Sequence, residues 1–357
     1  MEIKSCPECG VPEIATGEHI WLNNGDIIHK RAHSSRMVFL ETENLDFLFR
    51  GIEQIIGTPI EHMVITANRR AQRVYLRSFI PDKIIEKIRM KEMDYESIDA
   101  VFRDLGRIDG LGSYELVERR YEQDEEDFDT VSITEPHSVP MAVAAHVGAI
   151  EVLTGVDQGY RYEVVSPNVY HITSYPSPHP EELSERLWFQ PYEHQDGDLE
   201  LERCATCGGP KALSGYRWYQ DRGIILNKTT RRRTTIMGDA LLHPVFSELE
   251  KELGDEIPRA VVEAQRRFTK SGFYTVYDIV EEADFRTQLA LRGLGNLKEL
   301  SMIRKGMHMR VVNVALPLIL IGMFQGFYEM SFDLDSTDVD WQLSEEGDLE
   351  MEAKPRP

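Results

Sequence analysis

The sequence contains few cysteines, has a deficit of basic residues and lacks a long hydrophobic run. Its 357 residues include four cysteines, and 40 Lys and Arg against 61 Asp and Glu give a net charge of −21. Such a surface repels phosphate backbones, so we expect no nucleic-acid partner. The longest apolar run, 311–324, is interrupted by Asn313 and Pro317 and is shorter than the roughly 20 residues that span a bilayer. We expect this run to be buried core, and we expect no membrane partner.

Recognisable targeting and catalytic motifs are also missing. The N-terminal residues do not show a basic region followed by an apolar run, so we expect no secretory signal and a cytoplasmic location. The chain lacks the Gly-x-Ser-x-Gly, P-loop and dinucleotide-binding patterns, and an enzymatic activity is therefore unsupported. Hydrophobic residues at 41% and charged residues at 28% are ordinary for globular proteins, and the length suits about two domains.

The four cysteines form two Cys-x-x-Cys-Gly motifs, Cys6 with Cys9 and Cys204 with Cys207. Each motif presents two thiolates on one side of a tight turn, and two such turns complete the four-thiolate site that structural zinc prefers. We therefore predict one shared structural zinc. Iron in a rubredoxin-like site is a less favoured alternative, as are two separate redox dithiols, and the cytoplasmic location disfavours disulfides.

The context of the cysteine motifs is repeated along the chain. Gly10, Pro12 and Gly17 recur with the same spacing as Gly208, Pro210 and Gly215, and Gly110-Leu-Gly112 recurs as Gly293-Leu-Gly295. The pattern indicates an internal duplication. We predict a first module at 1–173, a linker at 174–203, a second module at 204–345 and a frayed acidic tail at 346–357. A metal site that takes one motif from each module predicts an approximate two-fold axis between them.

Periodicity predicts an α+β fold for each module. Apolar residues at helical spacing predict helices over 43–56 and 241–253, and strands are predicted at 114–120, 130–135 and 309–315. A further helix should begin near Pro140 in the first module and near Pro317 in the second, because proline suits a first helical turn. Extended segments starting near Tyr160 and Asp338 close the two modules.

This order of parts resembles the 4-vinyl reductase (4VR) domain, which is related to heme-NO-binding-like and TRAPP-like modules. The resemblance rests on 110–117 and 293–295, on 147–155 at the end of the proline-initiated helix, and on 325–329 in the second module. It implies an α+β module that binds a small hydrophobic molecule or forms a dimer, so a homo-oligomer is one expectation. Many family members have zinc-binding cysteines near the final strand, where this chain has Val164, Val165 and Ser166.

The resemblance also implies a ligand pocket between the sheet and the proline-initiated helix. In the first module its predicted lining is Met141, Ala145, His146, Val147 and Ile150. In the second module the predicted lining is Leu318, Ile321, Met323 and Phe327. Small residues around Ala145 should leave room in the first module, whereas the second has mostly larger groups in their place, namely Ile319, Leu320, Gly322 and Tyr328. We predict a cavity in the first module and a filled core in the second. His146 is alternatively interpreted as a buried, hydrogen-bonded histidine.

Two arginine pairs repeat in the modules, Arg69 with Arg70 and Arg266 with Arg267. Guanidinium groups bind carboxylate or phosphate through paired hydrogen bonds, which makes these pairs a candidate anion site. The alternative interpretation is that these arginines offset nearby acidic residues on a solvated surface.

Three functions follow from these patterns. The favoured hypothesis is a zinc-stapled sensor or accessory protein that holds a largely apolar small molecule. The second is a scaffold that docks onto a metabolic enzyme as its protein partner, and it predicts filled cores and an exposed apolar patch. The third is a reductase-type enzyme.

Overall fold

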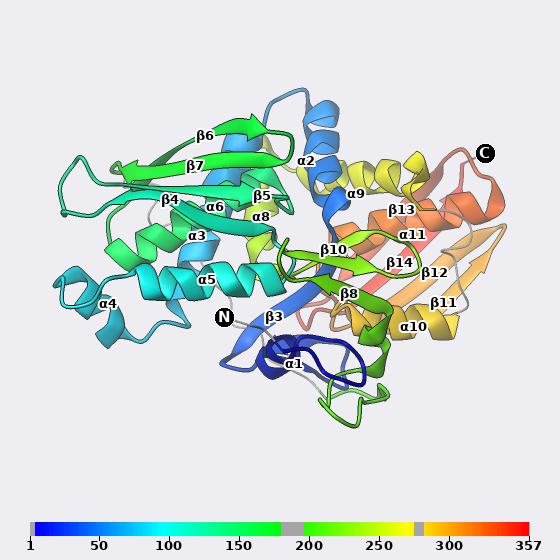
Figure 1. The fold of residues 1–357 in the computed structure, drawn as a ribbon. Coiled ribbons are helices and arrows are strands. Elements are labelled where there is room, and N and C mark those ends of the chain that lie inside the picture. Colours follow the sequence, from blue (N-terminus) through cyan, green and yellow to red (C-terminus); the bar gives the residue numbers. More distant parts are fainter. Residues whose placement is uncertain (1–3, 180–195, 275–281, 357) are drawn as a thin grey trace.

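A computed structural model describes residues 4–179, 196–274 and 282–356 of the chain. Within these residues the fold is α+β with three antiparallel sheets (Figure 1). A six-stranded sheet in the order β1-β2-β3-β10-β9-β8 lies between two four-stranded sheets, β4-β5-β7-β6 and β11-β12-β14-β13.

The elements of the first part of the chain follow the predicted order. They are α1 (Glu13–Glu18), β1 (His19–Trp21), β2 (Ile27–His29), β3 (Ala32–Glu41), α2 (Thr42–Ile56), α3 (Glu61–Arg77), α4 (Asp82–Arg89), α5 (Glu96–Ile108), β4 (Ser113–Arg120), β5 (Phe128–Thr134), α6 (Val139–Thr154), β6 (Gln158–Ser166) and β7 (Val169–Pro176).

The second part of the chain contains a similar series of helices and strands. Its elements are β8 (Tyr216–Tyr219), β9 (Ile224–Asn227), β10 (Arg233–Gly238), α8 (His243–Leu253), α9 (Ile257–Phe268), α10 (Glu282–Leu291), β11 (Asn296–Ile303), β12 (Gly306–Val312), α11 (Pro317–Phe332), β13 (Thr337–Leu343) and β14 (Leu349–Pro355). The α+β prediction is confirmed, and both proline-initiated helices begin within a residue of the predicted proline.

The first four-stranded unit is the sheet β4-β5-β7-β6 with helices α5 and α6, and the second is the sheet β11-β12-β14-β13 with helices α10 and α11 (Figure 1). Helices α6 and α11 are the central helices of these units. Each packs closely on an earlier helix, α6 on α3 and α11 on α9, because a glycine lies at the contact. A Cβ added at Gly148 would lie 2.8 Å from the Arg69 carbonyl oxygen, and one added at Gly326 would lie 2.7 Å from the Thr269 Cβ. The repeated glycines therefore permit close approach of two helices.

The six-stranded sheet joins the two parts of the chain. Strands β3 and β10 pair antiparallel, with Met37 opposite Gly238 and Glu41 opposite Thr234. Strands β1 and β2 form the first hairpin, which packs on the second four-stranded unit. There the Trp21 Nε1 donates a hydrogen bond to the Leu291 carbonyl of α10 at 2.9 Å.

Strands β8 and β9 form the second hairpin, which packs on the first four-stranded unit in the corresponding way. The Trp218 Nε1 donates to the Ile108 carbonyl at 3.0 Å. Each hairpin is thus in contact with the unit from the other part of the chain. The predicted division into 1–173 and 204–345 places each hairpin in the same module as the unit that follows it in sequence. In the structure, each hairpin contacts the unit of the other module.

The predicted tail at 346–357 is corrected by the structure. Strand β14 pairs with both β12 and β13, and it buries Leu349, Met351 and Ala353. Alternation of these apolar residues with Glu350, Glu352 and Lys354 places the charges on the exposed face. High charge density suggested disorder, but a period-two pattern within it is that of a half-buried strand.

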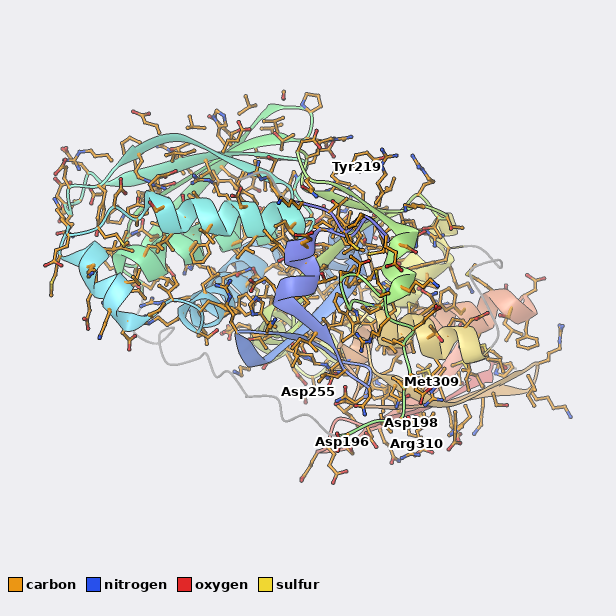
Figure 2. The ribbon with its side chains drawn as sticks, turned by 60° about the horizontal axis from the view of Figure 1, so that its bottom comes forward. Asp196, Asp198, Tyr219, Asp255, Met309 and Arg310 are labelled. Carbon is orange, nitrogen blue, oxygen red and sulfur yellow. The ribbon has the colours of Figure 1, made fainter. Side chains whose placement is uncertain are left out.

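The predicted linker at 174–203 is shorter than expected at its start, because β7 continues to Pro176. Residues 180–195 of the linker lie outside the described residues. The segment 196–203 runs along the second four-stranded unit without helix or strand, and Figure 2 shows Asp196 and Asp198 there. Asp198 pairs with Arg286 and Lys298 at 2.7 and 2.5 Å.

The apolar run 311–324 is buried as predicted. Val311, Leu320, Ile321 and Phe324 have essentially no exposed surface and form part of the largest core, between α11, α9 and the β11-β12-β14-β13 sheet. Among the described helices, none is both long and apolar enough to cross a membrane.

Candidate metal centre and apolar pocket

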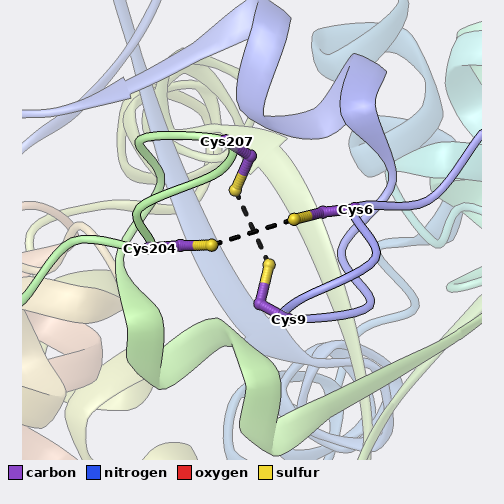
Figure 3. Close-up of side chains that lie close together, drawn as sticks. All are labelled: Cys6, Cys9, Cys204 and Cys207. Carbon is purple, nitrogen blue, oxygen red and sulfur yellow. Dashed lines mark hydrogen bonds between the residues drawn. The ribbon is translucent and has the colours of Figure 1, made fainter.

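The two Cys-x-x-Cys turns meet, and their four Sγ atoms face one centre (Figure 3). All four Sγ atoms lie within 4.8 Å of one another. The Sγ atoms of Cys6 and Cys204 are 3.8 Å apart, and those of Cys9 and Cys207 are 3.6 Å apart. A tetrahedral site with Zn–S bonds of about 2.3 Å has sulfur–sulfur separations of about 3.8 Å. The cluster therefore has the dimensions of a four-thiolate zinc site.

Backbone hydrogen bonds hold both turns in the same conformation. The Gly10 N–H donates to the Cys6 carbonyl at 2.8 Å, and the Gly208 N–H donates to the Cys204 carbonyl at 2.9 Å. Both glycines have a positive φ, 75° and 73°, which residues other than glycine rarely adopt. The cysteine side chains are thus aimed by the backbone of their own turn.

The electrostatics of the cluster favour a bound cation. The backbone N–H of Cys9 lowers the pKa of the Cys6 thiol to about 7, so one thiolate is readily formed. Burial raises the pKa of the Cys9 thiol to about 12, which opposes further ionisation beside the first thiolate. A metal ion supplies the positive charge that allows four clustered thiolates together.

This site is suited to a structural role. All four ligand positions are filled by cysteine, three of them buried, which leaves no open position for substrate or water. Across the turns, the Glu8 carboxylate accepts hydrogen bonds from the backbone N–H and the hydroxyl of Thr206, at 3.2 and 2.7 Å. The metal would join the two hairpins of the six-stranded sheet.

A mainly apolar pocket of about 380 Å³ lies beside this sheet. Helix α5 forms one wall, and α3, α6 and strand β10 form the others, with α1 and β2 at one end. Its apolar lining includes Ile14, Leu76, Phe79, Ile84, Ile98, Phe102, Leu105, Ile108 and Ile236. Apolar walls with a few polar groups are the usual character of a small-molecule site.

The predicted pocket residues fall on two sides of α6. Ala145 and His146 line the pocket, together with Ala149. Met141, Val147 and Ile150 instead face three separate cores and do not line it, which corrects their assignment. Helix α6 is apolar all round, so periodicity alone did not distinguish its pocket face from its core faces.

His146 has the hydrogen bond expected of a buried histidine. Its Nε2 lies 3.3 Å from the Asp129 carbonyl oxygen and 3.7 Å from the Asp129 carboxylate.

In the second unit the corresponding space is filled by aromatic rings. Phe285 of α10 packs on Phe324 and Phe327 of α11, with ring centroids 5.2 and 6.0 Å apart, and Tyr274 packs on Phe327 at 5.3 Å. All four side chains are buried. The predicted lining residues Ile321, Met323 and Phe327 belong to this core, and Leu318 packs against it.

Several titratable groups of the pocket are kept uncharged by burial. Burial lowers the pKa of His29 and of His137 to about 4. Burial, with the nearby Glu18 carboxylate, raises the pKa of Asp109 well above its usual range. No sequence motif placed His29, His137 or Asp109 in a pocket, because α5 and the hairpins reach it only through tertiary packing.

The four arginines do not form the predicted anion site, since carboxylates of the chain already face three of them. The Arg69 Nε lies 3.7 Å from Glu151 on α6, and the Arg69 Nη1 donates to the Gln158 carbonyl. The Arg266 Nη1 pairs with Glu329 on α11 at 2.6 Å.

The second arginines of the two pairs lie in different surroundings. Arg70 is buried, and Arg267 pairs with Glu263 at 2.7 Å. Arg69 and Arg266 therefore make helix-to-helix contacts, and Arg267 pairs within its own helix, which agrees in part with the alternative interpretation that these arginines offset nearby acidic residues.

A second cluster that the sequence did not suggest contains Glu151, Asp157 and His179. The His179 Nε2 lies 2.8 Å from Glu151, and Arg73 pairs with Asp157 at 2.9 Å. With Arg69 also facing Glu151, two guanidinium groups already balance the two carboxylates. The cluster is a hydrogen-bonded junction between α3, α6 and the segment after β7.

Comparison with known proteins finds a partial structural similarity. No protein-family model and no curated protein matches the chain. Among solved structures, a single-substitution mutant of the T. tengcongensis H-NOX domain is similar over 34% of this chain and 75% of its own, at 12% identity and a TM-score of 0.24. An oxygen-binding H-NOX domain related to soluble guanylate cyclases is similar over 34% of this chain and 73% of its own, at 11% identity and a TM-score of 0.23. About a third of the chain thus has a distant structural similarity to H-NOX domains.

Proposed function

We propose that this chain is a small-molecule-binding protein that holds a largely apolar ligand in the first unit and a structural zinc between its two hairpins. The apolar pocket between α5 and α6 is the observation that carries the proposal. A sensor or an accessory protein is the role that fits such a site, because the pocket has the size and the mainly apolar lining to hold a small molecule.

The zinc is supported by the four converging thiols and by their separations of 3.6 and 3.8 Å. Its role in this proposal is to fix the hairpins. Cys6, Cys9 and Cys204 belong to the same buried cluster as Ala15, Met37, Ile108 and Ile236, which line the pocket. A metal-held turn therefore supports one wall of the ligand site.

We further propose that the two units arose by internal duplication of a 4VR-like module and are related by an approximate two-fold axis. The two four-stranded sheets have equivalent strand orders, and α6 and α11 each span 16 residues. The reciprocal bonds from Trp21 to Leu291 and from Trp218 to Ile108 also support it. The scaffold hypothesis predicts filled cores in both units. The second unit has a filled core, but the first contains the pocket.

Binding of a neutral probe tests the ligand site. We expect 1-methylnaphthalene to bind wild-type protein in a fluorescence titration, with one site per chain. Ala145→Leu should weaken this binding by about tenfold or more, because the added side chain occupies part of the pocket.

The matched control is Met323→Leu, at the corresponding place on α11, where the core is filled and the volume is conserved. It should bind the probe as wild type does. Equal binding by wild type and Ala145→Leu, or loss of binding in Met323→Leu alone, contradicts the proposed site.

A further inference from the structure

Asp109 is a carboxyl group placed at the wall of the apolar pocket without a partner of its own. It directly follows α5, and its backbone carbonyl accepts hydrogen bonds from the Ile236 N–H at 2.7 Å and the Thr235 hydroxyl at 3.0 Å. The carboxyl itself makes no hydrogen bond or ion pair with any other residue that the structure describes. A carboxylate in an apolar site is costly unless a cation accompanies it.

The same backbone arrangement occurs a second time, with its cation present. The Phe39 N–H donates to the Arg292 carbonyl at 2.9 Å, as the Ile236 N–H does to Asp109. There the Arg292 guanidinium reaches the Glu41 carboxylate and the Phe39 carbonyl of β3. Position 292 of the second unit thus has an internal cation–carboxylate pair.

In the first unit the corresponding place has a carboxyl side chain, that of Asp109, but no second side chain that the structure describes pairs with it. Glu41 lies two residues after Phe39 on β3, and the residue two after Ile236 on β10 is Gly238, which has no side chain and lines the pocket. Asp109 therefore faces a space where the other unit has the second member of an ion pair. A ligand that enters the pocket can supply that member.

The other groups at this end of the pocket suit a positive charge. Glu18 lies close enough to Asp109 to oppose its ionisation, and Asp109 acts in the same way on Tyr75. The rings of Tyr75 and Phe79 are 4.7 Å apart and those of Phe79 and His29 are 4.5 Å apart, and all three line the pocket. Aromatic faces beside carboxyl groups attract organic cations.

We propose that the ligand is an apolar molecule carrying one cationic amine, with the ammonium group on Asp109 and the apolar body between α5 and α6. This inference rests on the proposed ligand-binding function and names its ligand class. Arg31 at the pocket end is not a competing cation for Asp109, because it pairs with Glu18 at 2.6 Å.

Three naphthalene probes of similar size test the charge preference on the full-length, metal-loaded protein. These are 1-naphthylmethylamine, 1-methylnaphthalene and 1-naphthoate, titrated by calorimetry or fluorescence at pH 7. We expect the amine to bind about tenfold or more tighter than 1-methylnaphthalene, and 1-naphthoate to bind most weakly, because a charge-assisted hydrogen bond forms only with the amine.

Asp109→Asn should remove the preference, so that the amine and 1-methylnaphthalene bind within about twofold of each other. Asp109→Glu keeps the charge and should retain a preference for the amine. The matched control is Glu92→Gln, which removes the same charge from an exposed residue outside the pocket and should behave as wild type. Metal content and the unfolding temperature of each variant establish that it is folded.

The outcomes separate the two proposals. If 1-methylnaphthalene and the amine bind wild type equally, the pocket stands and the amine assignment is overturned. The assignment is also overturned if Asp109→Asn keeps the amine preference. If none of the three probes binds wild type, both the ligand-binding function and the amine assignment are wrong.

Discussion

The central helices of the two four-stranded units show how one framework can hold a pocket or a filled core. Helices α6 and α11 both span 16 residues, begin with proline in the first turn and approach a neighbouring helix through glycine. On α6, Ala145, His146 and Ala149 border the pocket, whereas Phe324 and Phe327 of α11 pack on Phe285. The backbone architecture is similar, so side-chain volume on one helix face decides whether space for a ligand remains.

The four-cysteine cluster is the feature that the two parts share, and its loss should have the largest effect. Cys204→Ser removes one thiolate ligand, and we expect the free energy of unfolding to fall by on the order of 5 kcal/mol, because metal-binding free energy contributes to folding. Chemical denaturation and elemental analysis measure the two effects. Ala205→Ser, an exposed change in the same turn, should keep one zinc per chain. Two metals per wild-type chain would disprove the shared site.

The buried glutamates of α11 and α6 sharpen the comparison at the helix contacts. Glu329 is fully buried between Arg266 and Lys270, each at 2.6 Å, so Glu329→Ala leaves Lys270 without this counter-ion and Arg266 with Glu263 as its remaining one, and should cost about 3–5 kcal/mol. Glu151→Ala should cost less, because Arg69 is 3.7 Å from that carboxylate and keeps its bond to the Gln158 carbonyl. Denaturant unfolding of both variants gives the order, and a larger loss in Glu151→Ala would contradict it.

Exchanging side-chain size between the helices tests the comparison directly. Phe327→Ala removes a packed ring and should destabilise the protein by about 3–5 kcal/mol. Ala149→Phe should change stability by less than about 1.5 kcal/mol and abolish probe binding, because its ring enters existing space. Thermal unfolding and the 1-methylnaphthalene titration provide the readouts. A severe loss of stability in Ala149→Phe would indicate that the pocket is too small for a ring.

The pH dependence of stability should report the histidines of the pocket. Burial lowers the pKa of His29 and His137 to about 4 in the folded protein, against about 6.5 when unfolded. Between pH 6.5 and pH 4 these two histidines bind protons in the unfolded state but remain mostly neutral in the folded state. Stability should therefore be full above pH 6.5 and fall towards pH 4, by up to about 3 kcal/mol per histidine.

His137→Ala isolates one of these contributions. Ala315 precedes α11 by the same two residues as His137 precedes α6, so the variant copies the second unit. It should show a smaller loss of stability between pH 6.5 and pH 4, measured by denaturant unfolding at several pH values. An unchanged pH profile would assign the acid sensitivity to other groups.

Local sequence signals predicted the elements well and their tertiary partners less well. The cysteine spacing, the proline-initiated helices and the strands at 114–120 and 130–135 are local patterns, and the structure contains each of them. The crossing of the hairpins, seen in the bonds of Trp21 and Trp218, depends on tertiary packing that no local pattern encodes.

The candidate site divides in the same way. The cysteines were found from their motif, and Ala145 from the family resemblance together with side-chain size, but Asp109 and His137 reach the pocket from separate segments. Strand β14 was missed because its charges hid the alternation of Leu349, Met351 and Ala353.

The most direct test of the account is a crystal structure of the wild-type protein soaked with 1-bromonaphthalene, whose bromine is located by anomalous scattering. We predict one bromine site per chain in the first unit, between α5 and α6 and beside Ala145 and Ala149. No site should occur between α10 and α11, where Phe285, Phe324 and Phe327 fill the core. A bromine between α10 and α11, or none between α5 and α6, would contradict the account.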